Sequence, residues 1–455
     1  MEQWITQEIE RTELGDKRRT KRLIKIVENL SAKPEASVPV ASGTWAETKA
    51  TYDFWDSPYI QPSMIRQGHI DATVERIVQQ QQVVLAIQDT TELNYTSHKA
   101  LSGIGYLDSK YAQGLKVHSV FTVSVQGVPL GIIEQQVWAR IEEELGKAEQ
   151  RKQKSTADKE SQKWLNGLKA TDSIIPPSVQ VVTIADREAD IYDLFACSRR
   201  PGSEFLIRAS QNRCLDSSQE HLWETMASQP SQGKMTVQVN RSATQAQRTA
   251  TLDIRYTTIA IAPPQNRAKA ELLAPVTLQA ILVIETDPPP ECEPITWLLL
   301  TTLEITSLED GKQYVQWYSY RWLIERYHYV LKSGCGIENL QLETAQRLEM
   351  ALATYSIVAW RLLWLTYLAR CSPDDSCEQV LAPHEWQVLY ATLHHQLYPH
   401  TTPPTLAQAV HWIARLGGFL GRKSDGSPGV KVLWRGLSRL HDLVTGWLAC
   451  QSLNS

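Results

Sequence analysis

The sequence predicts a multidomain protein of the α/β class, and three observations support this prediction. The chain has 455 residues, which exceeds what one hydrophobic core organises and suggests two to four domains. Its apolar content of 42% and charged content of 21% are ordinary for a soluble globular protein. Helical patterns occupy both ends of the chain, whereas short β-branched and aliphatic runs fill the middle.

Residues 1–75 are predicted to be helical. Asp16 can cap a helix that runs through Leu23 and Val27, because its carboxylate can accept a hydrogen bond from the first turn. Further helical patterns follow as far as Gln80. The segment from residue 11 to residue 25 is rich in basic residues, namely Arg11, Lys17, Arg18, Arg19, Lys21, Arg22 and Lys25, against Glu13 and Asp16. Such a run is either a phosphate-binding face or a solvated helix face, and its composition leaves both interpretations open.

Strands are predicted next. Residues 83–89 (VVLAIQD) form a short aliphatic run that ends in an aspartate. Two further runs, 116–125 and 128–138, flank Gly127 and predict an antiparallel hairpin. Residues 179–186 (VQVVTIAD) predict another strand that ends in an aspartate, with a helix after it.

From residue 140 onward the chain again contains both helical and strand-like patterns. Residues 140–163 are charge-rich and predict a solvated helix or a linker. Residues 203–303 contain five strand-like runs divided by turns, and their place before an aromatic-rich helix predicts an insertion. Residues 345–370 predict a strongly apolar helix, and residues 378–455 are mostly helical in pattern. We therefore predict a helical N-terminal domain (1–75), a core formed by 76–202 and 304–370, a β-rich insertion (203–303) and a helical C-terminal domain (371–455).

Composition excludes several classes of protein. Seven cysteines are scattered without a CxxC pair, which argues against a disulfide framework or zinc ribbon and favours a reducing cytoplasm. The longest apolar run, Ala351–Trp360, ends at Arg361, so no transmembrane helix is predicted. The N-terminus is polar and acidic, unlike a secretory signal. The net charge of −4 excludes a uniformly basic protein.

Residues 317–332 (WYSYRWLIERYHYVLK) surround one glutamate with cations and aromatic rings. If they form one continuous helix, Tyr318, Arg321, Glu325 and Lys332 lie within an arc of about 60°. The aromatic and aliphatic residues then fall on the other side and predict a core-facing stripe. The simpler interpretation is an Arg–Glu pair on the surface of an amphipathic helix.

Three carboxylates suggest a metal site. Asp89 and Asp186 each follow an apolar strand, and ligands gather at strand ends in α/β folds. Together with Glu325 they can form a cage of hard oxygen atoms, which Mg²⁺ prefers. Two such ions can activate an attacking oxygen and stabilise a leaving oxygen in phosphoryl transfer. A single aspartate after a strand is more often a turn or helix cap, so the specificity lies in the order of all three acids.

Several motifs resemble one known family. The spacing of Tyr318, Arg321, Glu325 and Lys332 is similar to the Tyr-Arg-Glu-Lys motif of bacterial DDE transposases of the insertion-sequence-four family. Residues 85–95 and 185–195 resemble the first and second aspartate motifs of that family. Six further segments resemble the transposon-five branch of this family: LGDKRRTKRL (14–23), KVHSV (116–120), DKESQKWL (158–165), FLIRAS (205–210), ITWLLLTT (295–302) and IARLGGF (413–419).

The resemblance implies a ribonuclease-H-like catalytic core, a mixed sheet flanked by helices, with a β-rich insertion and helical domains at both ends. It implies cut-and-paste transposition: the protein binds terminal inverted repeats, nicks the transposon end by metal-dependent hydrolysis, forms a hairpin and joins 3′-OH ends to target DNA. Asp89, Asp186 and Glu325 match the metal-binding triad, with two Mg²⁺ ions and Mn²⁺ as an expected substitute. The implied partners are double-stranded DNA and a second copy of the chain, in the bacterial cytoplasm at the nucleoid and without a membrane.

The resemblance also implies DNA contacts. Tyr318, Arg321 and Lys332 match residues that hold phosphates near the cleavage site. Trp297 matches a tryptophan that receives a flipped base, although core packing in a strand is the alternative. The remaining expected DNA-binding residues are Arg208 in the insertion and Arg18, Arg19 and Arg22 in the N-terminal domain. His118 matches a family histidine to which we assign no role.

Departures and alternatives remain. Tyr329 stands where the transposon-five branch has a lysine, and Arg326 where it has an acid, which affects the expected DNA-end specificity. One alternative function is a ribonuclease-H-like nuclease that cuts DNA without joining ends. A second is a catalytically silent DNA-binding regulator derived from a transposase. A third is a structural protein whose acids form surface ion pairs.

Overall fold

The computed structural model of this chain contains two compact units, and each is described separately. Unit 1 comprises Met1–Gln80, Thr90–Leu145 and Leu323–Ser455, and unit 2 comprises Gln81–Asp89 and Gly146–Trp322. The structure describes residues 2–109, 111–140, 159–216, 220–239, 248–264, 273–290, 292–396, 402–422 and 425–454. Most of the charge-rich stretch 140–163, predicted as a solvated helix or linker, lies outside the described residues.

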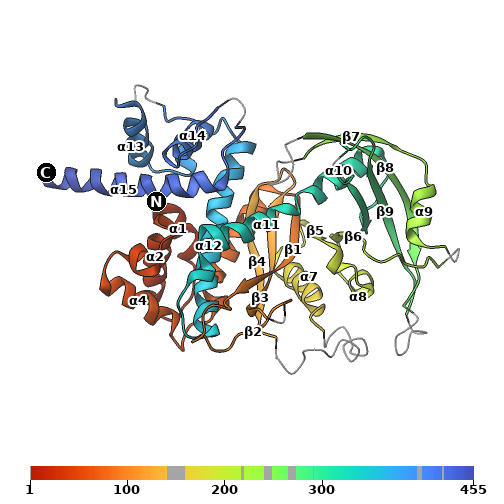
Figure 1. The fold of residues 1–455 in the computed structure, drawn as a ribbon, viewed down its shortest axis with the longest axis horizontal. Coiled ribbons are helices and arrows are strands. Elements are labelled where there is room, and N and C mark those ends of the chain that lie inside the picture. The colour runs from red at the N-terminus through yellow and green to blue at the C-terminus, as the bar shows by residue number, and fades with distance from the viewer. Residues whose placement is uncertain are drawn as a thin grey trace. The chain divides into compact units, whose positions relative to one another are not determined.

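Unit 1 begins with five helices (Figure 1, red and orange). They are α1 (Glu2–Ile9), α2 (Lys17–Ala32), α3 (Val38–Ser42), α4 (Trp45–Trp55) and α5 (Pro62–Gln80). The predicted cap of α2 is confirmed, because the Asp16 carboxylate accepts a hydrogen bond of 2.8 Å from the Arg18 backbone N–H. Leu23 and Val27 lie on its buried face, as their spacing predicts.

The strands of unit 1 are the second half of β1 (Val83–Asn94), with β2 (Gly105–Tyr106), β3 (Gln113–Ser124) and β4 (Pro129–Trp138). The predicted hairpin is confirmed: β3 and β4 pair antiparallel, and Gly127 in the turn has φ 90°, a conformation that favours glycine. Every residue of β3 after the first is buried. Helices α5 and α12 both pack against β4, which covers the hairpin.

The predicted single helix over 317–332 is wrong. Helix α10 (Leu308–Ser319) ends where the Tyr320 N–H donates to Trp317 O at 3.1 Å and the Arg321 N–H donates to Tyr318 O at 3.0 Å. These three-residue steps tighten the last turn and stop the helix. A new helix, α11 (Trp322–Tyr329), follows, and a π turn over Val330–Gly334 comes after it. An ideal rotation of 100° per residue therefore does not hold across the motif.

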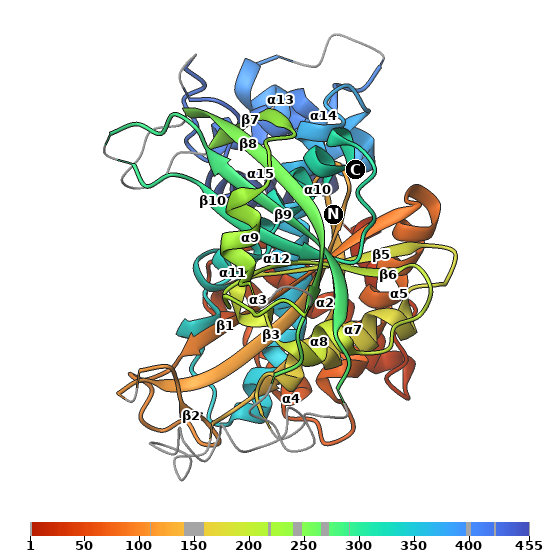
Figure 2. The same cartoon turned by 90° about the vertical axis from the view of Figure 1, so that its right-hand side faces the viewer.

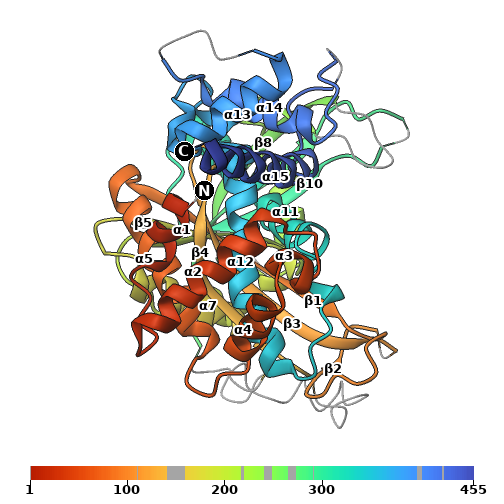
Figure 3. The same ribbon diagram turned by 90° about the vertical axis from the view of Figure 1, so that its left-hand side faces the viewer.

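Helix α12 (Ala345–Cys371) confirms the apolar helix predicted at 345–370. It is long and apolar enough to pass a length-and-composition test for a membrane span, but 83% of its most apolar window is buried inside the protein. It packs against α2, α5, β4, α14 and α15 (Figure 3). Its apolar surface is therefore explained by its place in the core of unit 1.

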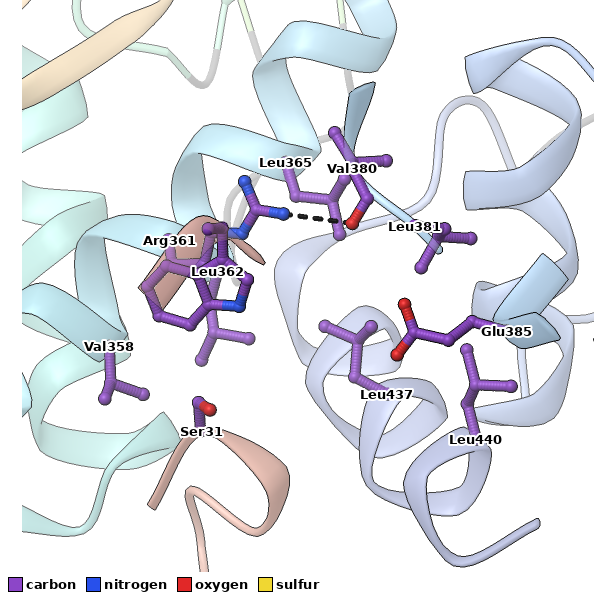
Figure 4. Close-up of a pocket in the computed structure, with 11 residues that line it drawn as sticks. Ser31, Val358, Arg361, Leu362, Leu365, Val380, Leu381, Glu385, Leu437 and Leu440 are labelled. Carbon is purple, nitrogen blue, oxygen red and sulfur yellow. Dashed lines mark hydrogen bonds between the residues drawn. The ribbon is translucent and has the colours of Figure 1, made fainter. Parts of the chain in front are cut away.

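The predicted helical C-terminal region is confirmed by α13 (Pro383–His394), α14 (Leu406–Leu416) and α15 (Val430–Asn454). A small cavity of about 40 Å³ lies between α12, α13 and α15, with Trp4 of α1 and Ser31 of α2 also lining it. Figure 4 shows Arg361 at its edge, donating to Val380 O at 3.1 Å, and Glu385 on the opposite side. Burial lowers the pKa of Arg361 to about 10. The cavity has room for only a few water molecules, far less than a ligand pocket needs.

Unit 2 contains one continuous run of strands. In order across the sheet these are the first half of β1, then β5 (Gln180–Ala185), β6 (Ser203–Arg208), β10 (Thr296–Thr301), β9 (Val276–Glu285), β8 (Arg248–Ile261) and β7 (Gly233–Val239). The pairs β1–β5 and β5–β6 are parallel, and the rest are antiparallel. Figure 2 shows the long strands of the antiparallel part in green. The five strands predicted in 203–303 are confirmed, and the first of them continues the parallel pairing.

Helices pack on these strands. They are α7 (Gln162–Ile174), α8 (Tyr192–Ala196) and α9 (Leu222–Ser228), in addition to α10. Helix α9 was not predicted, because its seven residues are too few for a clear helical period. The apolar core of unit 2 includes Trp164, Phe195 and Phe205, all nearly fully buried.

The contact of α14 with α15 depends on two glycines. A Cβ atom at Gly436 would lie 1.8 Å from Ile413 O, and one at Gly417 would lie 1.8 Å from Val432 O. Gly446, farther along α15, has nothing within 4 Å of a Cβ position. The two helices can therefore approach closely only where both glycines stand.

We expect Gly436→Ala to destabilise the protein by about 1–3 kcal/mol or more, because its methyl group forces the two helices apart. Gly446→Ala is the matched control and should stabilise by up to about 1 kcal/mol through helix propensity. Urea unfolding of both variants checks this. A Gly436→Ala protein as stable as the control would contradict the close approach.

Candidate active site

Asp89 and Asp186 lie on neighbouring parallel strands of unit 2. The β1–β5 register runs from Val83↔Gln180 to Ile87↔Ile184, so Asp89 and Asp186, each two residues farther on, lie at the same level of the sheet. Asp186 directly follows β5, as predicted. The prediction that Asp89 ends its strand is wrong, because β1 continues to Asn94 beside β3. Asp89 instead marks the end of the part that belongs to unit 2.

The backbone after β5 holds Asp186 in place. Its Oδ1 atom accepts a hydrogen bond of 2.9 Å from the Glu188 N–H and caps a short 3₁₀ turn over Arg187–Ala189. The other two acids of this motif have structural partners. Glu188 pairs with Lys163 at 3.3 Å, and buried Asp190 pairs with Arg213 at 2.5 Å. Neither therefore needs a metal to compensate its charge.

Positive charge gathers at the same end of the sheet. Arg208 ends β6, and its Nη2 donates to Thr296 O at 2.9 Å. Burial lowers the pKa of Arg208, and repulsion from Arg187 and Arg321 adds to this shift. Arg208 is therefore close enough to both Arg187 and Arg321 to be repelled by each, an arrangement that suits phosphate binding. Arg208 and Arg321 were predicted from the sequence, whereas Arg187 was not, and its signal was its place directly after Asp186.

Two aromatic residues pack beside the arginines. The rings of Trp297 and Tyr318 lie 5.2 Å apart in an edge-to-face arrangement. Tyr318 is buried, and its hydroxyl lies near Arg208 and Arg321 without a hydrogen bond of normal geometry to any residue that the structure describes. Burial raises its pKa, although both guanidinium groups oppose the shift, so the phenol is neutral near pH 7. Trp297 is half-buried.

The remaining motif residues belong to unit 1. Glu325 is exposed on α11. Lys332 lies in the π turn, with its Nζ 3.9 Å from Oε1 of Glu338. His118 is fully buried in β3, and its Nδ1 lies 2.9 Å from Oγ1 of Thr90, the residue after Asp89. This burial places His118 in the core of unit 1.

The three N-terminal arginines each have a protein partner. Arg18 pairs with Asp16 at 2.9 Å, and Arg22 with Glu47 at 2.5 Å. Arg19 donates to Leu14 O at 3.0 Å and lies over the Tyr59 ring, 4.8 Å from its centre. The Arg18 side chain is 91% exposed, so a DNA phosphate can compete with Asp16 for it.

The two aspartates suit a divalent cation in their chemistry. Their carboxylate oxygens are hard donors, the type that Mg²⁺ prefers. The two strands that carry them run about 4.8 Å apart. Among the described residues of either unit, no three His, Cys, Asp or Glu side chains form a group that could hold a metal ion. The donor set of unit 2 therefore supplies only part of a metal site.

Comparison with protein-family models identifies three matches that together span most of the chain. Residues 1–60 match the transposase DNA-binding model, residues 86–361 the transposase DDE domain, and residues 357–454 the transposase Tn5 dimerisation domain. The DDE match alone covers more than half of the 455 residues.

These matches confirm the resemblance found in the sequence and the ribonuclease-H-like class of the core. They identify DNA and a second copy of the chain as partners, and they support an enzyme of a class that uses divalent metal ions. The chain therefore belongs to the Tn5-like DDE transposases, the DNA transposases whose catalytic core carries an Asp-Asp-Glu motif.

Proposed function

We propose that the protein performs cut-and-paste transposition with Asp89, Asp186 and Glu325 as its catalytic carboxylates. The observation that carries this proposal is the register of β1 and β5, which sets two motif aspartates side by side at one end of the parallel pair. The three carboxylates would hold two Mg²⁺ ions, or Mn²⁺ in their place. Such ions supply activation of an attacking oxygen and charge stabilisation of a leaving oxygen.

The arginines would hold the DNA during these steps. Arg208 is repelled by Arg187 and by Arg321, so a phosphate beside Arg208 would relieve that repulsion and form charge-assisted hydrogen bonds. The buried Tyr318 hydroxyl is a further donor beside them. Lys332, held loosely at 3.9 Å from Glu338, can exchange this partner for a phosphate.

The proposed cleavage and joining of DNA strands needs no nucleotide cofactor. Water attacks a phosphodiester at the transposon end and releases a 3′-OH. That hydroxyl attacks the opposite strand, so one phosphodiester is exchanged for another and a hairpin forms. A second hydrolysis opens the hairpin, and the 3′-OH then joins target DNA. Trp297, half-buried against Tyr318, would receive a base that the tight hairpin turns outward.

The cellular location and the composition of the DNA complex are inferred from the two partners, DNA and a second copy of the chain. We infer that the transposase acts in the cytoplasm in association with the nucleoid, and its match to a transposase DNA-binding model supports this. The DNA complex would contain a homodimer formed through residues 357–454, with inverted repeats and target DNA as substrates.

Alanine at Asp89, Asp186 or Glu325 should lower strand cleavage by at least about 1,000-fold, because each removes a metal ligand, yet leave end binding largely intact. A labelled duplex carrying the inverted repeat, incubated with Mg²⁺ or EDTA and run on a denaturing gel, measures cleavage and any hairpin. A gel shift on the same duplex measures binding. If the alanine variants cleave normally, or lose binding and folding together, the acids are structural. Cleavage without a hairpin would favour the nuclease alternative.

Replacing Arg18 and Arg22 by alanine should weaken end binding and flatten its dependence on salt, by about one unit of slope for each DNA phosphate that the variant no longer neutralises. Lys312→Ala is the control, since Lys312 lies outside the DNA-binding match and pairs with Glu309 at 2.8 Å. Binding titrations at several salt concentrations give the slopes. An unchanged slope in the double variant would show that the basic run is only a solvated helix face.

A further inference from the structure

Helix α11 is too short and too interrupted to be positioned by its own backbone. It has eight residues, it follows the break at Tyr320 and Arg321, and it runs into a π turn. Its place in unit 1 must therefore be set by its buried side. Glu325 is exposed, whereas Tyr327, two residues on and rotated by about 200°, is fully buried.

Tyr327 makes two kinds of contact in the core. Its ring stacks on Phe121 of β3, with centroids 5.1 Å apart and planes inclined by 21°. Its hydroxyl lies 3.5 Å from Nε2 of Gln135 on β4. The ring contact fixes the depth of the side chain, and the hydroxyl contact adds a direction that apolar packing lacks.

Gln135 connects this hydroxyl to two other elements. Its Nε2 also lies 3.3 Å from Oγ of Ser119 on β3 and 3.2 Å from Oγ of Ser356 on α12. The Ser356 hydroxyl in turn donates to Oε1 of Gln135 at 3.3 Å. Gln135 and Ser356 are almost completely enclosed, so each polar atom that loses its partner there is costly. We call Ser119, Gln135, Tyr327 and Ser356 the α11 anchor.

The anchor opposes rotation of α11. A carboxylate roughly 6 Å from a helix axis moves by about 1 Å when the helix turns by about 10°. Metal–oxygen distances tolerate about 0.2 Å, and a misplacement of about 1 Å can reduce catalysis by about 100-fold. A small rotation that the apolar side chains would accept therefore matters to a carboxylate ligand.

We propose that the α11 anchor is a positioning device for Glu325: the hydroxyl of Tyr327 contacts Gln135, which Ser119 and Ser356 orient, and this contact sets the rotation of α11 and so the direction of the Glu325 carboxylate. This inference rests on the proposed role of Glu325 as a metal ligand. None of the four anchor residues touches the reacting atoms; they act through the helix.

The test compares Tyr327→Phe with Tyr355→Phe. Both tyrosines are fully buried, and each change removes one oxygen atom. The Tyr355 hydroxyl makes no hydrogen bond to any residue within the described part of the chain, so it serves as the matched control. Ser356→Ala is a second probe, which removes an anchor hydroxyl from α12 and keeps the test available if Tyr327→Phe fails to fold.

Four quantities are measured on the full chain: end binding, single-turnover cleavage, the Mg²⁺ concentration for half-maximal rate, and amide hydrogen exchange in residues 322–329. For Tyr327→Phe we expect cleavage about tenfold slower, a higher Mg²⁺ requirement and faster exchange in α11, with end binding unchanged. Ser356→Ala should shift the same quantities in the same direction. Tyr355→Phe should behave as the unsubstituted protein.

Equal cleavage, Mg²⁺ requirement and exchange in Tyr327→Phe and Tyr355→Phe would overturn the inference. Glu325→Ala, run in parallel, separates this result from failure of the proposed function. If Glu325→Ala is inactive and Tyr327→Phe matches its control, only the anchor is wrong. If Glu325→Ala cleaves normally, the role of Glu325 and the inference fail together.

Discussion

The parallel pairing of β1 with β5 is the constraint on which the candidate site depends. Five consecutive register pairs fix two strands that are distant in sequence, and the two motif aspartates follow at equal distance from the last pair. The next parallel strand, β6, brings Arg208 to the same end of the sheet. A slip of one residue in either pairing would turn these side chains to opposite faces. Acidic and basic groups thus meet because strand register, not loop conformation, places them.

The residues around the candidate site differ in their burial and in whether their charges are paired. Carboxylates that need no ligand are paired, as Asp190 is with Arg213 and Asp16 with Arg18. Near Tyr318, partly buried Arg208 is repelled by Arg187 and Arg321, and burial makes that repulsion stronger than in water. The buried side of α11, the helix that carries Glu325, faces neutral hydrogen-bonded groups such as Gln135 and Ser356, which orient the helix without adding charge. Paired charges stabilise the fold, and like charges brought together favour an anionic partner.

Much of this could be predicted from the sequence because the signals were local. The Asp16 cap, the hairpin at Gly127 and the apolar helix α12 each depend on residues close together in the chain. The break after α10 was missed because WYSYRWLIERYHY has a good helical pattern throughout, and the three-residue hydrogen bonds that end the helix have no strong sequence signal. The extension of β1 past Asp89 was missed because TTELN is polar, and only its neighbour β3 makes it a strand. The candidate site residues were identified from the spacing of sequence motifs. The fold class alone could not have identified them.

The strand β1 has a practical consequence for dissecting the protein into fragments. The chain leaves unit 2 between Asp89 and Thr90, inside a strand, and enters unit 1 again between Trp322 and Leu323, at the start of α11. Neither unit is therefore a contiguous stretch of polypeptide. A truncation series would cut a strand in half and leave exposed backbone edges that invite aggregation. Activities of this transposase are better assigned by point substitution, or by joining segments from a relative at matched positions wherever the chain passes between the two units.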